Sequence, residues 1–528
     1  MFNFLLTRQR KILLPLLIIL ITVAVFSWLQ STPALADPDS FYHAKISVMM
    51  RDFGIIRDFP WTQNSLYREL FIDHHFLYHI LLIPFVSFTD PLIGLKFATI
   101  LFASFSVLTI IWLLFKQKVR WLWLWLLLLL TSAPFIFRLS LGKAPSLAIG
   151  VTIIGFYFII TKRPLSLFVW TWLFVWFYSA WPLLILILSV YTVVEALWET
   201  YQLIKTKGTS VINYLLLSLK AWWSRPNRLL WLAVLTGIIS GLIINPYFPT
   251  NLFYLKQLFA MSLVGYYKFV GVGAEWYPWH VTELVANIAI PLLVWLVAVI
   301  FFFINFKKQS KLSWTALLLT TIFLLYSIKA RRQVEYFIPF SVISSALICR
   351  DILVKCSFKT WRREFVSWLP LYLRGKFFIG LICLYLIIIL PIGLGKGLIT
   401  AYKDLANGFA LDHLKNASQW LANNSQPQDI VFQSDWGTFP LLFYYNTHNY
   451  YQTGLDQTFM YEYDKEKYQQ WVDTTKGRNR DVYQVATKEF KASWLLLEKR
   501  KASMLKWINR DKQFVQVYQD DQAIIFKL

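Results

Sequence analysis

Acidic residues are scarce in this chain. Its 528 residues hold 29 Asp and Glu against 52 Lys and Arg, and no acid occurs between residues 91 and 194. The sequence also lacks a Gly-rich phosphate-binding loop and the His-Glu-x-x-His motif of zinc proteases. No Gly-x-Ser-x-Gly nucleophile elbow is present either. These absences disfavour nucleotide-dependent, metalloprotease and esterase-type enzymes, and they make each remaining carboxylate informative.

Apolar residues dominate instead. The chain is 57% hydrophobic, with 25 Trp and 44 Phe, and its mean hydropathy is +0.50. Several apolar runs approach the roughly 20 residues that cross a bilayer. We predict a polytopic α-helical membrane protein with about eleven transmembrane helices. The predicted spans are 12–29, 92–115, 121–137, 145–160, 165–179, 181–198, 229–245, 284–305, 312–328, 335–349 and 376–399.

Positive charge falls in alternate connections between these spans. The basic clusters are Arg8 to Lys11, Lys116 to Arg120, Lys162 with Arg163, Lys205 to Arg228, Lys307 to Lys311 and Arg350 to Lys376. Because Lys- and Arg-rich loops stay in the cytoplasm, loops 30–91 and 246–283, the turn 329–334 and everything after residue 400 are predicted to lie outside. The net charge of +23 is thus a topology signal, and no nucleic-acid partner is expected. All three cysteines lie on or near the cytoplasmic side, so no structural disulfide is expected.

Two parts are expected along the chain. Residues 1–400 form the transmembrane domain, and residues 401–528 form a small extracytoplasmic α/β domain, because helix-like and strand-like stretches alternate there. The expected helices are 411–421, 465–474, 481–490 and 502–509, and the expected strands are 430–433, 494–497, 514–518 and 523–526. The first span resembles a signal peptide as far as Ala36, but its length suits an uncleaved helix. Cleavage would make Asp37 a new N-terminus.

Polar candidates concentrate in the external loop 30–91. Four of the seven histidines lie between residues 43 and 79, and the neighbouring carboxylates include Asp37, Asp39 and Asp73. Residues 40–53 are predicted to form an amphipathic helix in the membrane interface, with His43 off its apolar face. Asp73 precedes a second apolar helix, 74–87, which it either caps or joins to the site. Asp37 is expected to be functional.

Asp37-Pro38, followed by Tyr42-His43-Ala44, resembles the Asp-Pro-x-x-x-Tyr-Arg-Ala stretch in the first external loop of the catalytic subunit of oligosaccharyltransferases. More broadly, the chain is similar to the GT-C superfamily of membrane glycosyltransferases. The resemblance implies an acidic motif just after the first helix, a polyprenyl-linked sugar donor, a site outside the cytoplasm and often a C-terminal soluble domain.

Transfer of a sugar from a lipid phosphate fits these residues. It needs a carboxylate to orient or deprotonate the acceptor and positive charge to stabilise the leaving phosphate. Asp37 or Asp39 would be the catalytic base. Arg331 and Arg332 lie on the predicted outer side, against the charge rule, and a guanidinium can bind the donor phosphate through two hydrogen bonds. Contact with lipid headgroups is the alternative role for this pair.

The second acidic pair of oligosaccharyltransferases is missing. At that point of the chain Arg138 and Gly142 are followed by Lys143. One possibility is a divalent metal, Mn or Mg, held by loop residues, and mixed carboxylate and imidazole ligands suit Mn or Zn better than Mg. Its expected ligands are Asp37, Asp39, Asp73, His74 and His75. The other possibility is that Lys143 and Arg138 replace the charge of the metal and bind the donor phosphate.

Residues for the acceptor or the sugar come from two further segments. Val281-Thr282-Glu283 partly matches a family motif whose Glu helps to hold metal and acceptor, although Glu283 could simply flank a helix. Ser434-Asp435-Trp436-Gly437 partly matches the Trp-Trp-Asp-Tyr-Gly motif that reads acceptor peptides, without the preceding Trp residues. Asp435 is placed for a site, and Trp436 and Tyr444 either stack on sugar rings or pack in the core. Recognition of an Asn-x-Ser/Thr peptide is therefore not expected.

The sequence thus predicts a membrane glycosyltransferase that moves a sugar or oligosaccharide from a polyprenyl phosphate or pyrophosphate to an extracytoplasmic protein, lipid or glycan. It would be a multi-pass protein of a prokaryotic plasma membrane, in contact with membrane lipid. Two alternatives stay open. One is protein glycosylation of the oligosaccharyltransferase type. The other is a non-enzymatic transporter of lipid or solute, which would place ionisable residues or Gly/Pro breaks at mid-membrane.

Overall fold

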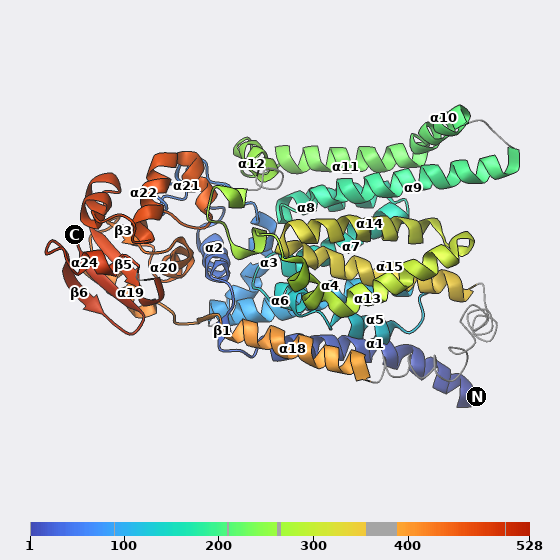
Figure 1. The fold of residues 1–528 in the computed structure, drawn as a ribbon, viewed down its shortest axis with the longest axis horizontal. Helices are drawn as coiled ribbons and strands as arrows, with labels where there is room; N and C mark the ends of the chain where they lie inside the picture. Colours follow the sequence, from blue (N-terminus) through green and yellow to red (C-terminus); the bar gives the residue numbers. More distant parts are fainter. Residues whose placement is uncertain (1, 89, 208–210, 261–265, 355–387, 502) are drawn as a thin grey trace.

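Long helices form a bundle, and a sheet-containing unit lies at one end of it (Figure 1). The computed structural model describes residues 2–88, 90–207, 211–260, 266–354, 388–501 and 503–528. The N-terminus and helix α10 (Val211–Trp222) lie at the end opposite the sheet. The basic N-terminal segment and the basic segment around α10 are therefore far from the C-terminal unit, as the charge pattern predicts for loops on opposite sides of a membrane.

The bundle supports the prediction of a polytopic membrane protein. Its long helices are α1 (Phe2–Leu29), α4 (Pro91–Lys116), α7 (Pro145–Ile160), α8 (Pro164–Phe177), α9 (Pro182–Lys207), α11 (Arg225–Ile243), α13 (Val281–Ile304), α14 (Lys311–Lys329), α15 (Val334–Val354) and α18 (Leu390–Ala406). Within the described residues, six helices are long and apolar enough to cross a membrane, or seven with one bent pair. The predicted count of eleven is not confirmed, because α7 and α8 are shorter than a standard span. The predicted span 376–399 lies partly outside the described residues.

The predicted span 121–137 is not one helix, and this is a correction. It divides into α5 (Leu122–Leu129) and α6 (Ala133–Leu139), which are bent by 86°. Pro134 stands in the first turn of α6, where its missing N–H costs nothing, and Ser132 before the turn is extended. After the break, α6 carries Arg138 in its last turn, and the loop that follows carries Lys143.

The helices of the first loop are more buried than the sequence suggests. α2 (Asp39–Phe53) packs against α3 (Phe76–Val86), α4 and a helix of the C-terminal unit. The predicted apolar face is buried at Tyr42 and Ile46, but Phe53 is 76% exposed. His43, which was expected off that face, is buried too. Packed elements therefore cover the His43 side of α2 as well as most of its apolar face, and its predicted place in the membrane interface stays a prediction.

The C-terminal unit is a five-stranded mixed sheet with helices around it. The strand order is β4 (Tyr450–Tyr451), β3 (Ile430–Gln433), β5 (Trp494–Glu498), β7 (Ala523–Lys527) and β6 (Val515–Gln519). Strands β4, β3 and β5 are parallel to one another, and β7 is antiparallel to both of its neighbours, β5 and β6. Its main helices are α19 (Lys415–Asn424), α20 (Phe439–Tyr445), α21 (Gln457–Tyr463) and α22 (Lys465–Thr475). The four predicted strands are all present, so the α/β class is confirmed. β4, α20 and α21 were not predicted.

This unit is joined directly to the first loop. Strand β1 (Ala34–Leu35) pairs antiparallel with β2 (Phe409–Ala410), and the backbone around Trp61 bonds to Tyr451 at the sheet edge. The Phe41 ring of α2 meets the Tyr444 ring of α20 edge-on at 5.8 Å. The residues around Asp37 are therefore held on one side by the membrane helices and on the other by the C-terminal unit.

Replacing Gly408 by Ala is expected to disturb the site from outside it. A Cβ on Gly408 would lie 2.2 Å from the Leu35 carbonyl oxygen, two residues before Asp37. Relief requires β1 and β2 to separate, at about 1–3 kcal/mol. We expect a lower melting temperature and reduced transfer activity in the purified variant. Gly395 in α18 is the matched control, because a Cβ there meets open space. Gly395→Ala should be neutral or stabilising, and equal losses in both variants would contradict this assignment.

Candidate functional site

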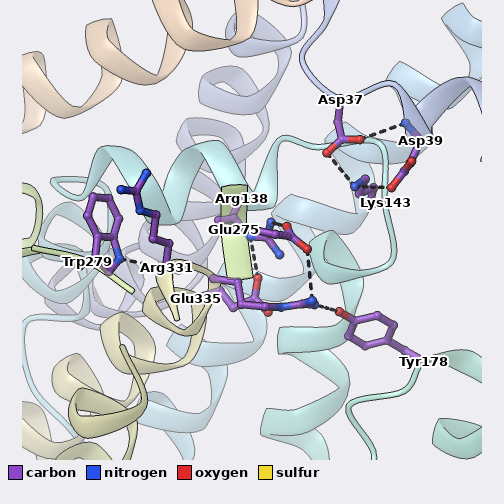
Figure 2. Close-up of polar contacts among 10 residues, drawn as sticks. Asp37, Asp39, Arg138, Lys143, Tyr178, Glu275, Trp279, Arg331 and Glu335 are labelled. Carbon is purple, nitrogen blue, oxygen red and sulfur yellow. Dashed lines mark hydrogen bonds and ion pairs between the residues drawn. The ribbon is translucent and has the colours of Figure 1, made fainter. Parts of the chain in front are cut away.

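Two carboxylates and one lysine meet just after the first helix. Lys143 Nζ lies 2.7 Å from Asp37 Oδ2 and 2.7 Å from Asp39 Oδ2. The second oxygen of Asp37 accepts the backbone N–H of Asp39 at 3.0 Å, which fixes the turn into α2. Figure 2 shows these three side chains converging. We call them the carboxylate–lysine triad. Helix α2, which begins at Asp39, lies at the end of the bundle nearest the C-terminal unit (Figure 1).

The loop between α6 and α7 places Lys143 rigidly. A Cβ on Gly142 would lie 2.9 Å from the Leu95 side chain and 3.0 Å from Ser40 Oγ, so this loop presses against the start of α2. The Gln30 side chain donates a hydrogen bond to the Ser140 carbonyl at 2.7 Å. Lys143 therefore approaches the two aspartates on a packed backbone, and its side chain is only 14% exposed.

The triad changes the proton affinities of its members. Burial raises the pKa of Asp39 to about 6, although the neighbouring Lys143 ammonium opposes the rise. Burial alone would lower the pKa of Lys143, but Asp37 and Asp39 outweigh it and hold that pKa above its ordinary value. Lys143 is therefore charged at neutral pH, whereas Asp39 takes up a proton in mildly acidic solution.

A pH dependence follows from the Asp39 carboxyl. Its pKa of about 6 lies above the ordinary value, so Asp39 is ionised above that pH and protonated below it. If the ionised Asp39 is needed to hold Lys143, transfer activity should fall by about tenfold per pH unit below the pKa of Asp39. Single-turnover rates between mildly acidic and neutral pH would measure this acidic limb of the pH–rate profile. Asp39→Asn should remove it, and His75→Asn should not. An unchanged limb in Asp39→Asn would contradict the assignment.

An arginine–glutamate cluster lies beside the triad. Arg138 Nε bonds to Glu335 Oε2 at 2.9 Å, and Arg138 also bonds to Glu275. Arg332 Nη1 lies 3.2 Å from Glu275 Oε1, and Arg332 Nη2 donates a hydrogen bond to the Tyr178 hydroxyl. Burial alone would raise the pKa of Glu275, but the two arginines outweigh it and hold that pKa well below its ordinary value. Figure 2 shows Glu275 next to Arg138, with a line of contacts that continues from Glu275 to the Tyr178 hydroxyl.

Arg331 is the most accessible of the predicted phosphate ligands. Its side chain is 38% exposed, against 13% for Arg332, 14% for Lys143 and 9% for Arg138. Arg331 lies over the Trp279 ring at 5.1 Å and 3.7 Å from the half-exposed Glu283 carboxylate. A weak surface ion pair of this kind can be exchanged for a phosphate. Arg138 and Arg332 already have carboxylate partners.

The loop histidines form a buried chain rather than an open cluster. Asp73 Oδ2 lies 2.6 Å from His79 Nδ1, and His79 Nε2 lies 2.7 Å from His43 Nδ1. Asp73 also accepts the backbone N–H of His75 at 2.9 Å in the turn before α3. The N-cap residue of α3 is His75, without a capping side chain, so the predicted capping role of Asp73 is wrong. Burial lowers the pKa of His43 and His75, and that of His74 to about 4, so all three are neutral at pH 7. This chain ties α3 to α2 beneath the triad.

The predicted metal ligands do not come together around one point. Asp37 and Asp39 face Lys143, whereas Asp73 faces His79, and the His74 ring stacks on Tyr254 at 4.8 Å. Among the described residues, no group of three His, Cys, Asp or Glu side chains could hold a metal ion. The Lys143 ammonium also lies between the two aspartates that a metal would need. As placed, these residues do not fit a divalent ion.

The predicted acceptor residues of the C-terminal unit have packing partners. Asp435 Oδ1 accepts the Gly437 N–H, and its Oδ2 lies 3.2 Å from Lys501 Nζ. Trp436 packs on the core of that unit, and Tyr444 packs on Phe41. In the part of the chain that the structure describes, no recorded contact joins Asp435 to the triad. The role of these residues toward an acceptor stays a prediction.

Two residues of the site were not anticipated from the sequence. Glu335 is 1% exposed at the start of α15, and Tyr178 follows α8 directly. Glu335 had a detectable signal, because an acid at the edge of an apolar span is costly unless it is paired. Tyr178 had no such signal, since the chain holds 27 tyrosines.

Comparison with known proteins gives similarity in structure alone. No family model matches the sequence, and no curated protein is similar to it. An Archaeoglobus fulgidus oligosaccharyltransferase tethered with an acceptor peptide containing the NVT sequon has a TM-score of 0.60 at 13% identity, over 98% of this chain and 74% of that one. The structure of the same archaeal enzyme in complex with Zn and sulfate has a TM-score of 0.56 at 12% identity, over 97% of this chain and 73% of that one.

A second kind of enzyme shares the fold over its whole length. ArnT from Cupriavidus metallidurans in the apo state has a TM-score of 0.54 at 12% identity, over 97% of each chain. The identities are low, so these likenesses concern the fold alone, and at that level the resemblance noted in the sequence is confirmed. The chain has the fold of these solved structures, and six of its described helices are long and apolar enough to cross a membrane.

Proposed function

We propose that this protein is a membrane glycosyltransferase that takes a sugar or oligosaccharide from a polyprenyl phosphate or pyrophosphate and transfers it to an acceptor outside the cytoplasm. The observation that carries the proposal is the carboxylate–lysine triad, formed directly after the first helix of a GT-C fold. Asp37 and Asp39 are the catalytic carboxylates. The two arginines of the arginine–glutamate cluster are already neutralised by Glu275 and Glu335, so the accessible Arg331 is the residue proposed to supply positive charge.

The reaction assigns one role to each group. A carboxylate of the triad accepts the proton of the acceptor nucleophile while the bond from that nucleophile to the anomeric carbon forms. The bond from the anomeric carbon to the phosphate oxygen breaks, and its electron pair leaves with the phosphate. Arg331, as the most accessible guanidinium, binds this phosphate and stabilises its growing charge.

The direct test uses purified full-length protein in liposomes. The donors are a polyprenyl phosphate and a polyprenyl pyrophosphate carrying a radiolabelled sugar, and the acceptors are a lipid, a glycan and an Asn-x-Ser/Thr peptide. We expect label on the lipid or glycan, with release of the unglycosylated polyprenyl carrier. Label on the peptide would favour the oligosaccharyltransferase-type alternative. Movement of donor across the bilayer with no labelled product would overturn the proposal in favour of transport.

A further inference from the structure

We propose that the Lys143 ammonium is the resident cation of this site and that Asp37 and Asp39 bind it in place of a divalent metal ion. The inference rests on the proposed function for its catalytic meaning, but its geometry stands alone. Lys143 Nζ contacts one carboxylate oxygen from each aspartate at 2.7 Å. Figure 2 shows the lysine reaching into the gap between the two acids. A divalent ion shared by these carboxylates would need that same position.

Packing makes this arrangement part of the fold rather than a surface ion pair. The lysine side chain is 14% exposed, and that of Asp37 is 21% exposed. Gly142 brings the loop backbone close to Ser40 and Leu95, since a Cβ there would lie 3.0 Å from Ser40 Oγ and 2.9 Å from the Leu95 side chain. A surface lysine would pay rotamer entropy to hold two partners, whereas this backbone already points the side chain at them. The cation is thus built in and covalently attached.

The other acids of the site are committed to protein cations as well. Glu275 faces Arg138 and Arg332, and Glu335 faces Arg138. Hard divalent ions such as Mg²⁺ and Mn²⁺ need several oxygen ligands. A metal here would have to displace Lys143, bind Asp37 and Asp39, and complete its coordination with water, because Glu275 and Glu335 are held by arginines. The described residues offer no group of three ligands.

The charge of the cation also matters for the chemistry. A divalent ion would neutralise both aspartates, whereas one ammonium neutralises the charge of only one. The triad therefore keeps a net negative charge, so one carboxylate retains the basicity needed to accept a proton from the acceptor. Lys143 orients the two aspartates and is in this sense a positioning residue.

Manganese binding tests the inference without any substrate. We would measure Mn²⁺ binding to the full-length protein in detergent by electron paramagnetic resonance, after treatment with EDTA. The wild type should bind no stoichiometric Mn²⁺ at this site. Lys143→Met frees Asp37 and Asp39 and should bind Mn²⁺ roughly tenfold or more tighter than the wild type. The double variant Asp37→Asn with Lys143→Met should lose that gain.

Lys96→Met is the matched control. Lys96 is another buried lysine near the first loop, but it bonds to the backbone carbonyls of Gln30 and Thr32 rather than to carboxylates. Its removal should create no Mn²⁺ site. Stoichiometric binding by the wild type that Asp37→Asn abolishes would overturn the inference, whether or not the lysine variant folds. A folded Lys143→Met protein that gains no Mn²⁺ would also overturn it.

Measuring sugar transfer with and without EDTA separates the proposed transferase function from the proposed role of Lys143. If both are right, transfer by the wild type persists in EDTA. If the transferase assignment is wrong, no variant transfers sugar, yet the Mn²⁺ gain of Lys143→Met still appears and supports the resident cation. Transfer that EDTA abolishes and Mn²⁺ restores would support the enzyme and overturn the resident cation.

Discussion

Asp37→Asn should lower sugar transfer by roughly 10²–10⁴-fold, the range typical for loss of a catalytic acid or base. The substitution preserves the shape of the side chain. Its amide oxygen can still accept the Asp39 N–H that now bonds to Asp37 Oδ1 at 3.0 Å. What is lost is the negative charge that faces Lys143. Transfer rates with saturating lipid-linked donor, together with the melting temperature, would separate lost chemistry from lost folding.

A second loop carboxylate provides the control for Asp37. Asp90 also accepts a backbone N–H at the start of a helix, because its side chain bonds to the Leu92 N–H at 2.8 Å and caps α4. Asp90→Asn keeps that cap and touches no part of the triad, so it should keep full activity. A correctly inserted Asp37→Asn protein with wild-type transfer would remove Asp37 from the catalytic machinery. Equal losses in both variants would point to a general effect of charge in this loop.

Arg138→Met should be among the most destabilising single changes in the chain. Arg138 is 7% exposed and compensates Glu335, which is 1% exposed, as well as Glu275. Removing one partner of a buried ion pair leaves the other charge uncompensated and costs about 3–5 kcal/mol. The loss would appear as a lower melting temperature in detergent. Adding Glu335→Gln should restore part of the stability, because it removes the stranded charge.

Arg478 is the comparison for this prediction. It pairs with Asp473 at 3.3 Å in the C-terminal unit, but its side chain is 63% exposed. Exposed ion pairs contribute only about 0–1 kcal/mol to stability. The melting temperature of Arg478→Met should therefore be close to that of the wild type. Similar melting temperatures for Arg138→Met and Arg478→Met would show that the arginine–glutamate cluster is not structural. They would also leave Arg138 free for the phosphate role predicted from the sequence.

Much of the fold could be predicted, because its signals are local. Apolar runs marked the bundle helices, and a short β-like run marked strand β3 at its observed limits, Ile430–Gln433. The bend at Pro134 was missed, because hydropathy does not distinguish a straight span from two short helices. Strands β1 and β2 were missed because two residues each carry no periodic pattern.

The sequence allowed the residues of the triad to be predicted, but not the contacts between them. Asp37, Asp39 and Lys143 were all identified as candidates, and the structure brings them together. Whether lysine or metal stood between the aspartates stayed open, since that depends on how the loop at Gly142 packs against α2. The burial of His43 was misjudged for a similar reason. Its partner His79 lies on another helix, and no helical periodicity reports such a contact.

The pairing of β1 with β2 has a consequence for biosynthesis. Leu35 emerges from the ribosome early, whereas its partner Phe409 is made only after the bundle helices of the membrane region. The segment that carries Asp37 can therefore pair with β2 only after most of the chain has been translated. The C-terminal unit must also have reached the same side of the membrane. A nascent or truncated chain would insert its first helices without an ordered active site. Order in the segment around Asp37 thus depends on residues that are synthesised after the bundle.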